Sequence, residues 1–271
     1  MSADEKLAAF VAGMSKRDGS ALVAGLYLVG SHALADVRPD SDVDFLGVLH
    51  RLPEGAELST LAALHDRLQA SWPAPHLDGH YVLATDLRRP PGDVEPVLRY
   101  LLGERVESAP GAVTPVEWLT LKWRGVALMG VPADNLHVNA DVEALRSYCR
   151  RNLVEYWRPQ IERLAELAEV DELVAWVGRQ VSWIALGVPR LLASIETGEV
   201  LSKTEAGRYA LAQFPEWRSV LEASLEQRRA PRPEQIPVLA AMAPQVVAFG
   251  RRCLKVALPN DRAERLECLG G

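Results

Sequence analysis

Apolar and polar positions divide the chain into two parts with different periodicities. Up to residue 110, helical spacing in LAAFVAGMSK (7–16) and LSTLAALHDRLQASW (58–72) predicts two helices. Short apolar runs at GLYLVG (25–30), VDFLGVLH (43–50) and LDGHYVLATDL (77–87) predict strands. This part is therefore predicted to be an α+β domain with a small mixed sheet flanked by helices.

After residue 115 the apolar positions recur at helical spacing, and no strand is predicted. Helices are expected at residues 116–128, at 142–157, in the segment that begins at Leu173, and at 236–258. Gly198 is predicted to end the Leu173 helix and Pro189 to kink it. This part reads as an all-α helical bundle.

A Pro- and Gly-rich stretch at residues 88–115 separates the two patterns, and we interpret it as a short helix followed by the crossing between domains. The boundary is expected between Gly103 and Pro115. The predicted organisation is a first domain at 1–110, a helical domain at 116–258, and a tail at 259–271 that frays.

Composition narrows the class of protein. A chain of 271 residues that is 48% hydrophobic can bury a core in each domain. The three cysteines are far apart and form no CxxC pair, which argues against structural zinc and for a reducing compartment. The first residues lack the pattern of a secretory signal, so we expect a cytoplasmic protein. Arg179, Gln180 and Arg190 interrupt the Leu173 segment, which favours a buried helix over a membrane span.

The formal net charge is -6, and the whole excess of acidic residues lies in residues 1–116. Nucleic-acid grooves need clustered Lys and Arg, so the charge argues against a nucleic-acid partner. Trp118, Trp123, Trp157 and Trp183 lie in helical apolar patterns and are predicted to be core residues.

The stretch GSHALADVRPDSDVDFLGVL (30–49) carries the candidate chemistry. Gly30 and Ser31 follow a strand and open a helix, where free backbone N–H groups can seat a phosphate. Asp42 and Asp44 point to one side of the next strand, because side chains alternate with a period of two. Two carboxylates this close suit Mg²⁺. A phosphate seat beside a magnesium seat indicates a nucleotide site.

These residues resemble the signature of the nucleotidyltransferase superfamily, a Gly-Ser followed by Asp-x-Asp. More closely, the stretch is similar to the aminoglycoside 3''-adenylyltransferases, the streptomycin and spectinomycin resistance enzymes. LTLKWRGVALMGVP (119–132) and RLLASIETGEV (190–200) resemble later stretches of that family. The resemblance implies an N-terminal nucleotidyltransferase catalytic domain and a C-terminal helical domain that binds the substrate.

The family also implies a third carboxylate on a later strand, as metal ligand or as general base. By strand position His80 lies where the family carries glutamate, and Asp78 lies two residues earlier on the same strand face. Asp78 is the predicted third carboxylate. His80 is the alternative base, since an imidazole titrates near neutral pH.

The resulting prediction is an Mg²⁺-dependent enzyme that transfers AMP from ATP to a hydroxyl of a small cationic acceptor, an aminoglycoside, and releases pyrophosphate. Gly30, Ser31 and Ser41 are the candidate nucleotide-binding residues, and Asp42, Asp44 and Asp78 the candidate metal ligands. We expect a monomer. Two alternatives stay open, namely a different acceptor (another small molecule, a protein or a tRNA end) and an inactive nucleotide-binding regulator. The acidic segment ERLAELAEVDELVAW (162–176) is interpreted as a solvated helix face rather than a drug site.

Overall fold

The computed structural model describes residues 3–14, 22–38 and 41–258. The chain forms two compact units, Met1–Asp141 and Val142–Gly271, which are described separately. The first unit thus extends past the boundary predicted between Gly103 and Pro115. The predicted tail at 259–271 lies outside the described residues.

The first unit is built on a six-stranded sheet in the order β5-β4-β3-β2-β1-β6. Strands β2 and β3 pair in parallel and the other neighbours pair antiparallel, so the sheet is mixed, as predicted. A parallel pair needs a crossover connection, which helix α3 supplies here. The bounds of the strands are β1 (Val23–Leu28), β2 (Val43–Leu49), β3 (Leu77–Leu83), β4 (Leu98–Leu101), β5 (Glu104–Val106) and β6 (Val126–Met129).

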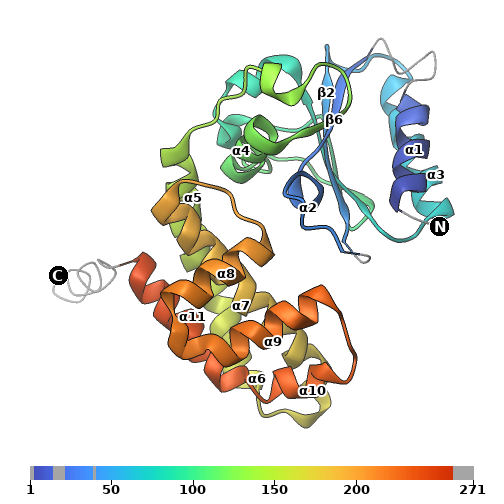
Figure 1. Ribbon diagram of the computed structural model, residues 1–271. Coiled ribbons are helices and arrows are strands. Elements are labelled where there is room, and N and C mark those ends of the chain that lie inside the picture. Colours follow the sequence, from blue (N-terminus) through green and yellow to red (C-terminus); the bar gives the residue numbers. More distant parts are fainter. Residues whose placement is uncertain (1–2, 15–21, 39–40, 259–271) are drawn as a thin grey trace, which may run out of the picture. The chain divides into compact units, whose positions relative to one another are not determined.

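Helices cover both faces of this sheet (Figure 1). On one face α1 (Ala3–Met14) and α3 (Glu57–Ser71) bury an apolar cluster that includes Phe10, Phe45 and Tyr81. On the other face α4 (Pro115–Arg124) buries Trp118 and Leu121 against alternate residues of the same strands. The short helix α2 (Gly30–Ala33) joins β1 to the loop before β2. Strand side chains alternate between the two faces of a sheet. The side chains of β2 that do not pack against α1 and α3 therefore lie on the opposite face, which α4 covers.

Three strands were not predicted. The segment 88–115, expected to be a short helix and a crossing, contains β4 and β5. Strand β6 lies after residue 115, where no strand was expected, and pairs with β1. The helix predicted at 116–128 ends at Arg124, because Gly125 stops it and the chain turns into β6.

The second unit is an all-α bundle, as predicted. Helix α7 is its longest element, runs through Pro189, and ends at Gly198 in the left-handed conformation predicted for a C-cap. The residues from Leu153 to Trp157 form a π-helical turn between the first two helices. The bounds are α5 (Val142–Asn152), α6 (Arg158–Leu167), α7 (Val174–Thr197), α8 (Lys203–Gln213), α9 (Arg218–Arg229), α10 (Gln235–Ala240) and α11 (Ala243–Ala257). Within the described part of the chain, no helix is both long enough and apolar enough to cross a bilayer.

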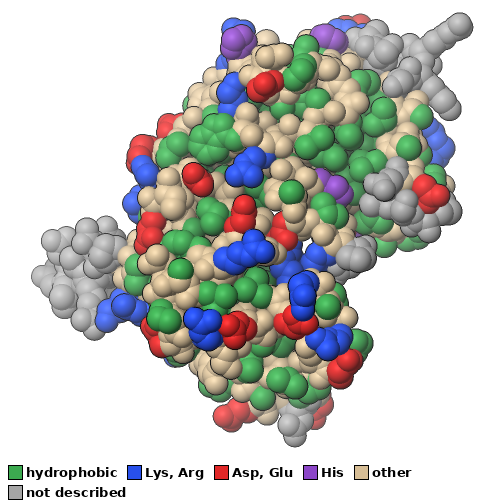
Figure 2. Space-filling view, in the orientation of Figure 1, with side chains coloured by type: hydrophobic (Ala, Val, Ile, Leu, Met, Phe, Trp, Pro, Cys, Tyr) green, Lys and Arg blue, Asp and Glu red, His purple; other side chains and the backbone are tan. Residues whose placement is uncertain are grey.

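Acidic and basic side chains are interspersed on the surface of the helical unit (Figure 2). Arg251 of α11 donates to the carboxylate of Glu162 on α6, and Arg218 pairs with Glu222 one turn along α9. The predicted solvated face at 162–176 therefore has its first carboxylate paired with an arginine. Such exposed pairs stabilise the fold by well under about 1 kcal/mol each.

Candidate active site

The turn that joins β1 to α2 brings the chain against the side chain of Asp44. Gly30 has φ +56°, and a Cβ atom at this position would lie 1.8 Å from Oδ2 of Asp44. The backbone N–H of Ser31 donates to the Asp44 carboxylate, and the N–H of Val29 donates to the Asp44 carbonyl oxygen, 3.0 Å away. Only glycine allows this approach, so the predicted Gly-Ser turn and the predicted acidic strand end form one site.

The helix at this turn is shorter than the phosphate-seat argument assumed. Helix α2 has four residues, so it contributes little dipole at its N-terminus. The backbone N–H of Ser31 donates to the Asp44 carboxylate. The Ser31 hydroxyl is buried and has no hydrogen-bond partner, which leaves it available to a ligand oxygen.

Three carboxylates gather at one edge of the sheet. Asp44 of β2 is in register with Asp78 of the parallel strand β3, so the two side chains lie next to each other on the same face. Asp42 precedes Asp44 by two residues. The pKa of Asp44 is raised to about 6, chiefly by burial and to a lesser extent by the negative charges of Asp78, Glu117 and Asp42, against the lowering effect of the Ser31 N–H. This electrostatic strain is the condition that a bound cation would relieve.

The two flanking carboxylates are held by backbone N–H groups. Oδ1 of Asp42 accepts from the N–H of His76, 3.0 Å away, and Oδ1 of Asp78 accepts from the N–H of Gly103, 2.9 Å away. Among the residues that the structure describes, no three His, Cys, Asp or Glu side chains form a preformed metal cluster. The donors are nevertheless hard oxygens with unused acceptor capacity, which is the set that Mg²⁺ prefers.

His80, the alternative base, lies on the same strand face as Asp78 and is 8% exposed. Its Nδ1 lies 2.9 Å from Oε1 of Glu117 on α4, an ion-pair distance. Neither ring nitrogen meets the geometry of a hydrogen bond. The Glu117 carboxylate is fixed by its other oxygen, which accepts from the N–H of Thr114 at 2.8 Å.

Glu117 was not predicted as a site residue. The sequence Thr114-Pro-Val-Glu117 has the pattern of a helix capping box, and the structure contains that box. The capping pattern accounts for Glu117 without reference to the site. Glu117 also lies beside His80, because α4 packs on the face of the sheet that carries Asp44 and His80. Only the position of α4 reveals the contact between Glu117 and His80.

Ser41 was predicted to bind the nucleotide, and its hydroxyl is engaged locally. It accepts from the N–H of Arg38 at 2.9 Å, while the Ser41 N–H donates to the Arg38 carbonyl oxygen at 3.0 Å. Ser41 thus closes the turn that leads into β2. This geometry supports a role in shaping the approach to Asp42, and it gives the hydroxyl a partner within the protein.

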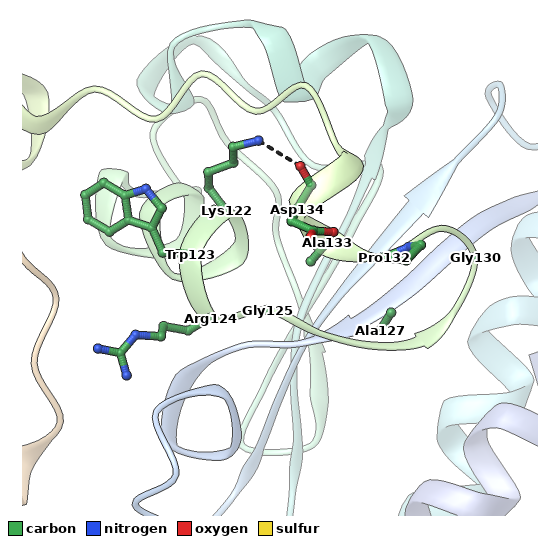
Figure 3. Close-up of a pocket in the computed structure, with 9 residues that line it drawn as sticks. All are labelled: Lys122, Trp123, Arg124, Gly125, Ala127, Gly130, Pro132, Ala133 and Asp134. Atoms are coloured by element: carbon green, nitrogen blue, oxygen red, sulfur yellow. Dashed lines mark hydrogen bonds between the residues drawn. The ribbon is translucent and has the colours of Figure 1, made fainter.

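A shallow pocket of about 400 Å³ lies between α4 and the turn after β6, away from the carboxylates (Figure 3). Lys122 spans it and donates to the carbonyl oxygens of Asp134 and Leu136, each 3.0 Å away. Trp123 projects away from the turn and is 47% exposed, so its prediction as a core residue was wrong. The lysine that lines the pocket, Lys122, is hydrogen-bonded to backbone carbonyl oxygens. The described residues that line the pocket do not form a cluster of catalytic or metal-binding side chains.

Comparison with known proteins bears on both units. Residues 160–255 match the family described as aminoglycoside adenylyltransferase, C-terminal domain. A search of curated protein sequences gave no match. Among solved structures, the chain is similar to spectinomycin adenyltransferase AAD(9) from Enterococcus faecialis, whose crystal structure contains ATP and spectinomycin. The identity is 12%, the TM-score is 0.61, and the match covers 90% of this chain and 99% of that chain.

At this identity the likeness to AAD(9) establishes the fold, and the family match is independent of it because it rests on sequence. The predicted fold class and the predicted resemblance are therefore confirmed. The chain thus has the fold of AAD(9), and its residues 160–255 resemble the C-terminal domain of the aminoglycoside adenylyltransferases.

Proposed function

We propose that this protein is an adenylyltransferase that transfers AMP from ATP to a hydroxyl group of an aminoglycoside antibiotic and releases pyrophosphate. The observation that carries the proposal is the packing of Gly30 against the carboxylate of Asp44, next to Asp78 on the neighbouring strand. The turn brings backbone N–H groups and a free hydroxyl to the same place as the carboxylates. The match at residues 160–255 supports an aminoglycoside as the acceptor.

The carboxylates fit a divalent cation. Asp42 and Asp44 would hold Mg²⁺, with Asp78 as a third ligand, because burial and the neighbouring negative charges raise the pKa of Asp44. In Asp42 and in Asp78 the backbone N–H donated by a described residue reaches Oδ1, so Oδ2 would face the cation. Bound Mg²⁺ would neutralise charge on the phosphates and favour departure of pyrophosphate. Gly30 and Ser31 would contact the phosphates from the other side.

The transfer needs a base for the acceptor proton. The acceptor oxygen attacks the α-phosphorus, the bond from that phosphorus to the oxygen bridging to the β-phosphorus breaks, and the hydroxyl proton passes to a side chain. We propose the Asp78 carboxylate as the base. His80 is the second candidate, and Glu117 beside it would keep its ring oriented.

The test is pyrophosphate release in the presence of ATP, Mg²⁺ and a panel of aminoglycosides that includes spectinomycin and streptomycin. We expect release that requires both the metal and one of the antibiotics, with the mass of the antibiotic increased by one adenylyl group. Asp44→Asn serves as the inactive control. Nucleotide binding without transfer to any aminoglycoside would contradict the proposal and would favour another acceptor or an inactive regulator.

A further inference from the structure

A buried lysine lies behind the carboxylate site. Lys6 of α1 has no exposed surface, which is unusual for a lysine. Its Nζ donates to the carbonyl oxygen of Trp72 at 2.7 Å, to that of Pro75 at 2.5 Å, and to Oε1 of Gln69 at 3.3 Å. These acceptors use the three donors of the ammonium group. Lys6 therefore ties the turn at 72–76, between α3 and β3, to two helices.

Gln69 connects this turn to a second one. Its Nε2 donates to the carbonyl oxygen of Pro73 at 3.0 Å and lies 3.2 Å from Nδ1 of His76. On its other side, Gln69 packs against Gly103, where a Cβ atom would lie 2.4 Å from Oε1 of Gln69. One amide side chain thus contacts both the 72–76 turn and the turn between β4 and β5.

These two turns supply the backbone donors of the site. The N–H of His76 holds Oδ1 of Asp42, and the N–H of Gly103 holds Oδ1 of Asp78. Lys6 and Gln69 fix the positions of both donors from behind. A displacement of either turn would therefore move a carboxylate of the site without any change in the carboxylates themselves.

The electrostatics connect the lysine to the same two carboxylates. Burial lowers the pKa of Lys6, and the negative charges of Asp42 and Asp78 oppose that effect, which places the lysine within electrostatic reach of both carboxylates. A buried lysine adds little to the stability of the fold, because apolar replacements of buried ionic groups are often neutral or stabilising. The location of Lys6 is better explained by the groups that it orients.

We propose that Lys6 and Gln69 are positioning residues that set Asp42 and Asp78 in the geometry required to bind a divalent cation together with a nucleotide. The proposal rests on the proposed function for the identity of the ligand. Residues outside the ligand shell commonly change metal affinity by about 10- to 100-fold when they orient the ligands.

The test compares Lys6→Met and Gln69→Leu with Phe10→Leu. Methionine keeps the length of the lysine and removes its donors, and leucine removes both functions of the Gln69 amide. Phe10 is fully buried on the same helix and contacts Phe45 and His65, so its variant loosens α1 without touching either turn. The readout is the rise in melting temperature caused by a slowly reacting ATP analogue, measured as a function of Mg²⁺ concentration.

We expect the Mg²⁺ concentration at half-maximal shift to rise about tenfold or more in Lys6→Met and Gln69→Leu, and to stay at the wild-type value in Phe10→Leu. Unchanged Mg²⁺ midpoints in the first two variants, with lowered melting temperatures alone, would overturn the inference and leave the proposed function intact. A wild-type protein without any Mg²⁺-dependent shift would overturn both. If Lys6→Met does not fold, the half-buried Gln69 decides the question alone.

Discussion

Replacement of Gly30 by alanine tests the central contact of the site. The backbone there has φ +56°, which costs an alanine about 1 kcal/mol relative to glycine. The added Cβ would also lie 1.8 Å from Oδ2 of Asp44, whereas real Cβ contacts begin at about 3.0 Å. The carboxylate would therefore have to move by more than about 1 Å, a displacement that can cost an enzyme about 100-fold in rate.

A matched control separates the two costs. Gly55 has φ +53°, nearly the same conformation, and a Cβ atom there would meet no neighbour within 4 Å. We expect Gly55→Ala to lower the free energy of unfolding by about 1 kcal/mol and to keep full activity. Gly30→Ala should be destabilised further and should lose about 100-fold or more in pyrophosphate release. Chemical denaturation and the pyrophosphate assay measure the two quantities. Near-normal turnover of Gly30→Ala would refute the assignment of Asp44 to the site.

The other predictions concern the acidic and imidazole groups. Asp44→Asn should abolish transfer and raise the melting temperature of the metal-free protein, because it removes repulsion among carboxylates, and an active variant would contradict this. Because the pKa of Asp44 is raised to about 6, its proton is bound more tightly in the folded state, and the metal-free protein should lose up to about 3 kcal/mol of stability as pH rises from about 4 to 6. Urea titrations should show this slope in the wild type and lose it in Asp44→Asn. If Asp78 is the base, Asp78→Asn should lower the rate by about 100-fold or more and His80→Ala by much less, and the reverse ranking in the same assay would make His80 the base. Glu117→Gln should then affect the rate only to the extent that His80→Ala does.

The central part of the fold was readable because its signals are local. Residues 43–50 contain a short apolar run that is buried at nearly every position, and Gly30 with Ser31 marks a tight turn that the structure retains at φ +56°. The face shared by Asp42 and Asp44 follows from the period of a strand alone. The neighbouring position of Asp78 needed one further assumption, that the third strand pairs beside the second.

The missed strands lack local signals. The turn between β4 and β5 consists of Leu102 and Gly103, both with positive φ. A two-residue hairpin turn of this kind is usually recognised in a sequence by Asn-Gly or Asp-Gly, and leucine at the first position does not give that signal. Strand β6 is a four-residue apolar run directly after α4, and its spacing continues the helical pattern. Here tertiary pairing with β1 decides the structure, and periodicity does not contain that information.

The site residues that sequence reasoning missed act through contacts between distant segments. Glu117 is part of a capping box by pattern, and its contact with His80 depends on where α4 lies on the sheet. Lys6 and Gln69 look like ordinary polar positions of two helices. Lys6 contacts Pro75 across 69 residues of the chain, and the two turns hold Asp42 and Asp78 across 34 and 25 residues.

The parallel pairing of β2 with β3 has a consequence for synthesis of the chain. When strand β2 leaves the ribosome, its antiparallel partner β1 has already been synthesised. Its other edge has no partner until α3, the 72–76 turn and β3 have been synthesised. During that interval the strand that carries Asp44 exposes unpaired backbone groups and the apolar side chains of Phe45 and Leu46, a template for pairing with another chain. The strand that carries the candidate chemistry is therefore also the edge on which a stalled or truncated nascent chain would aggregate.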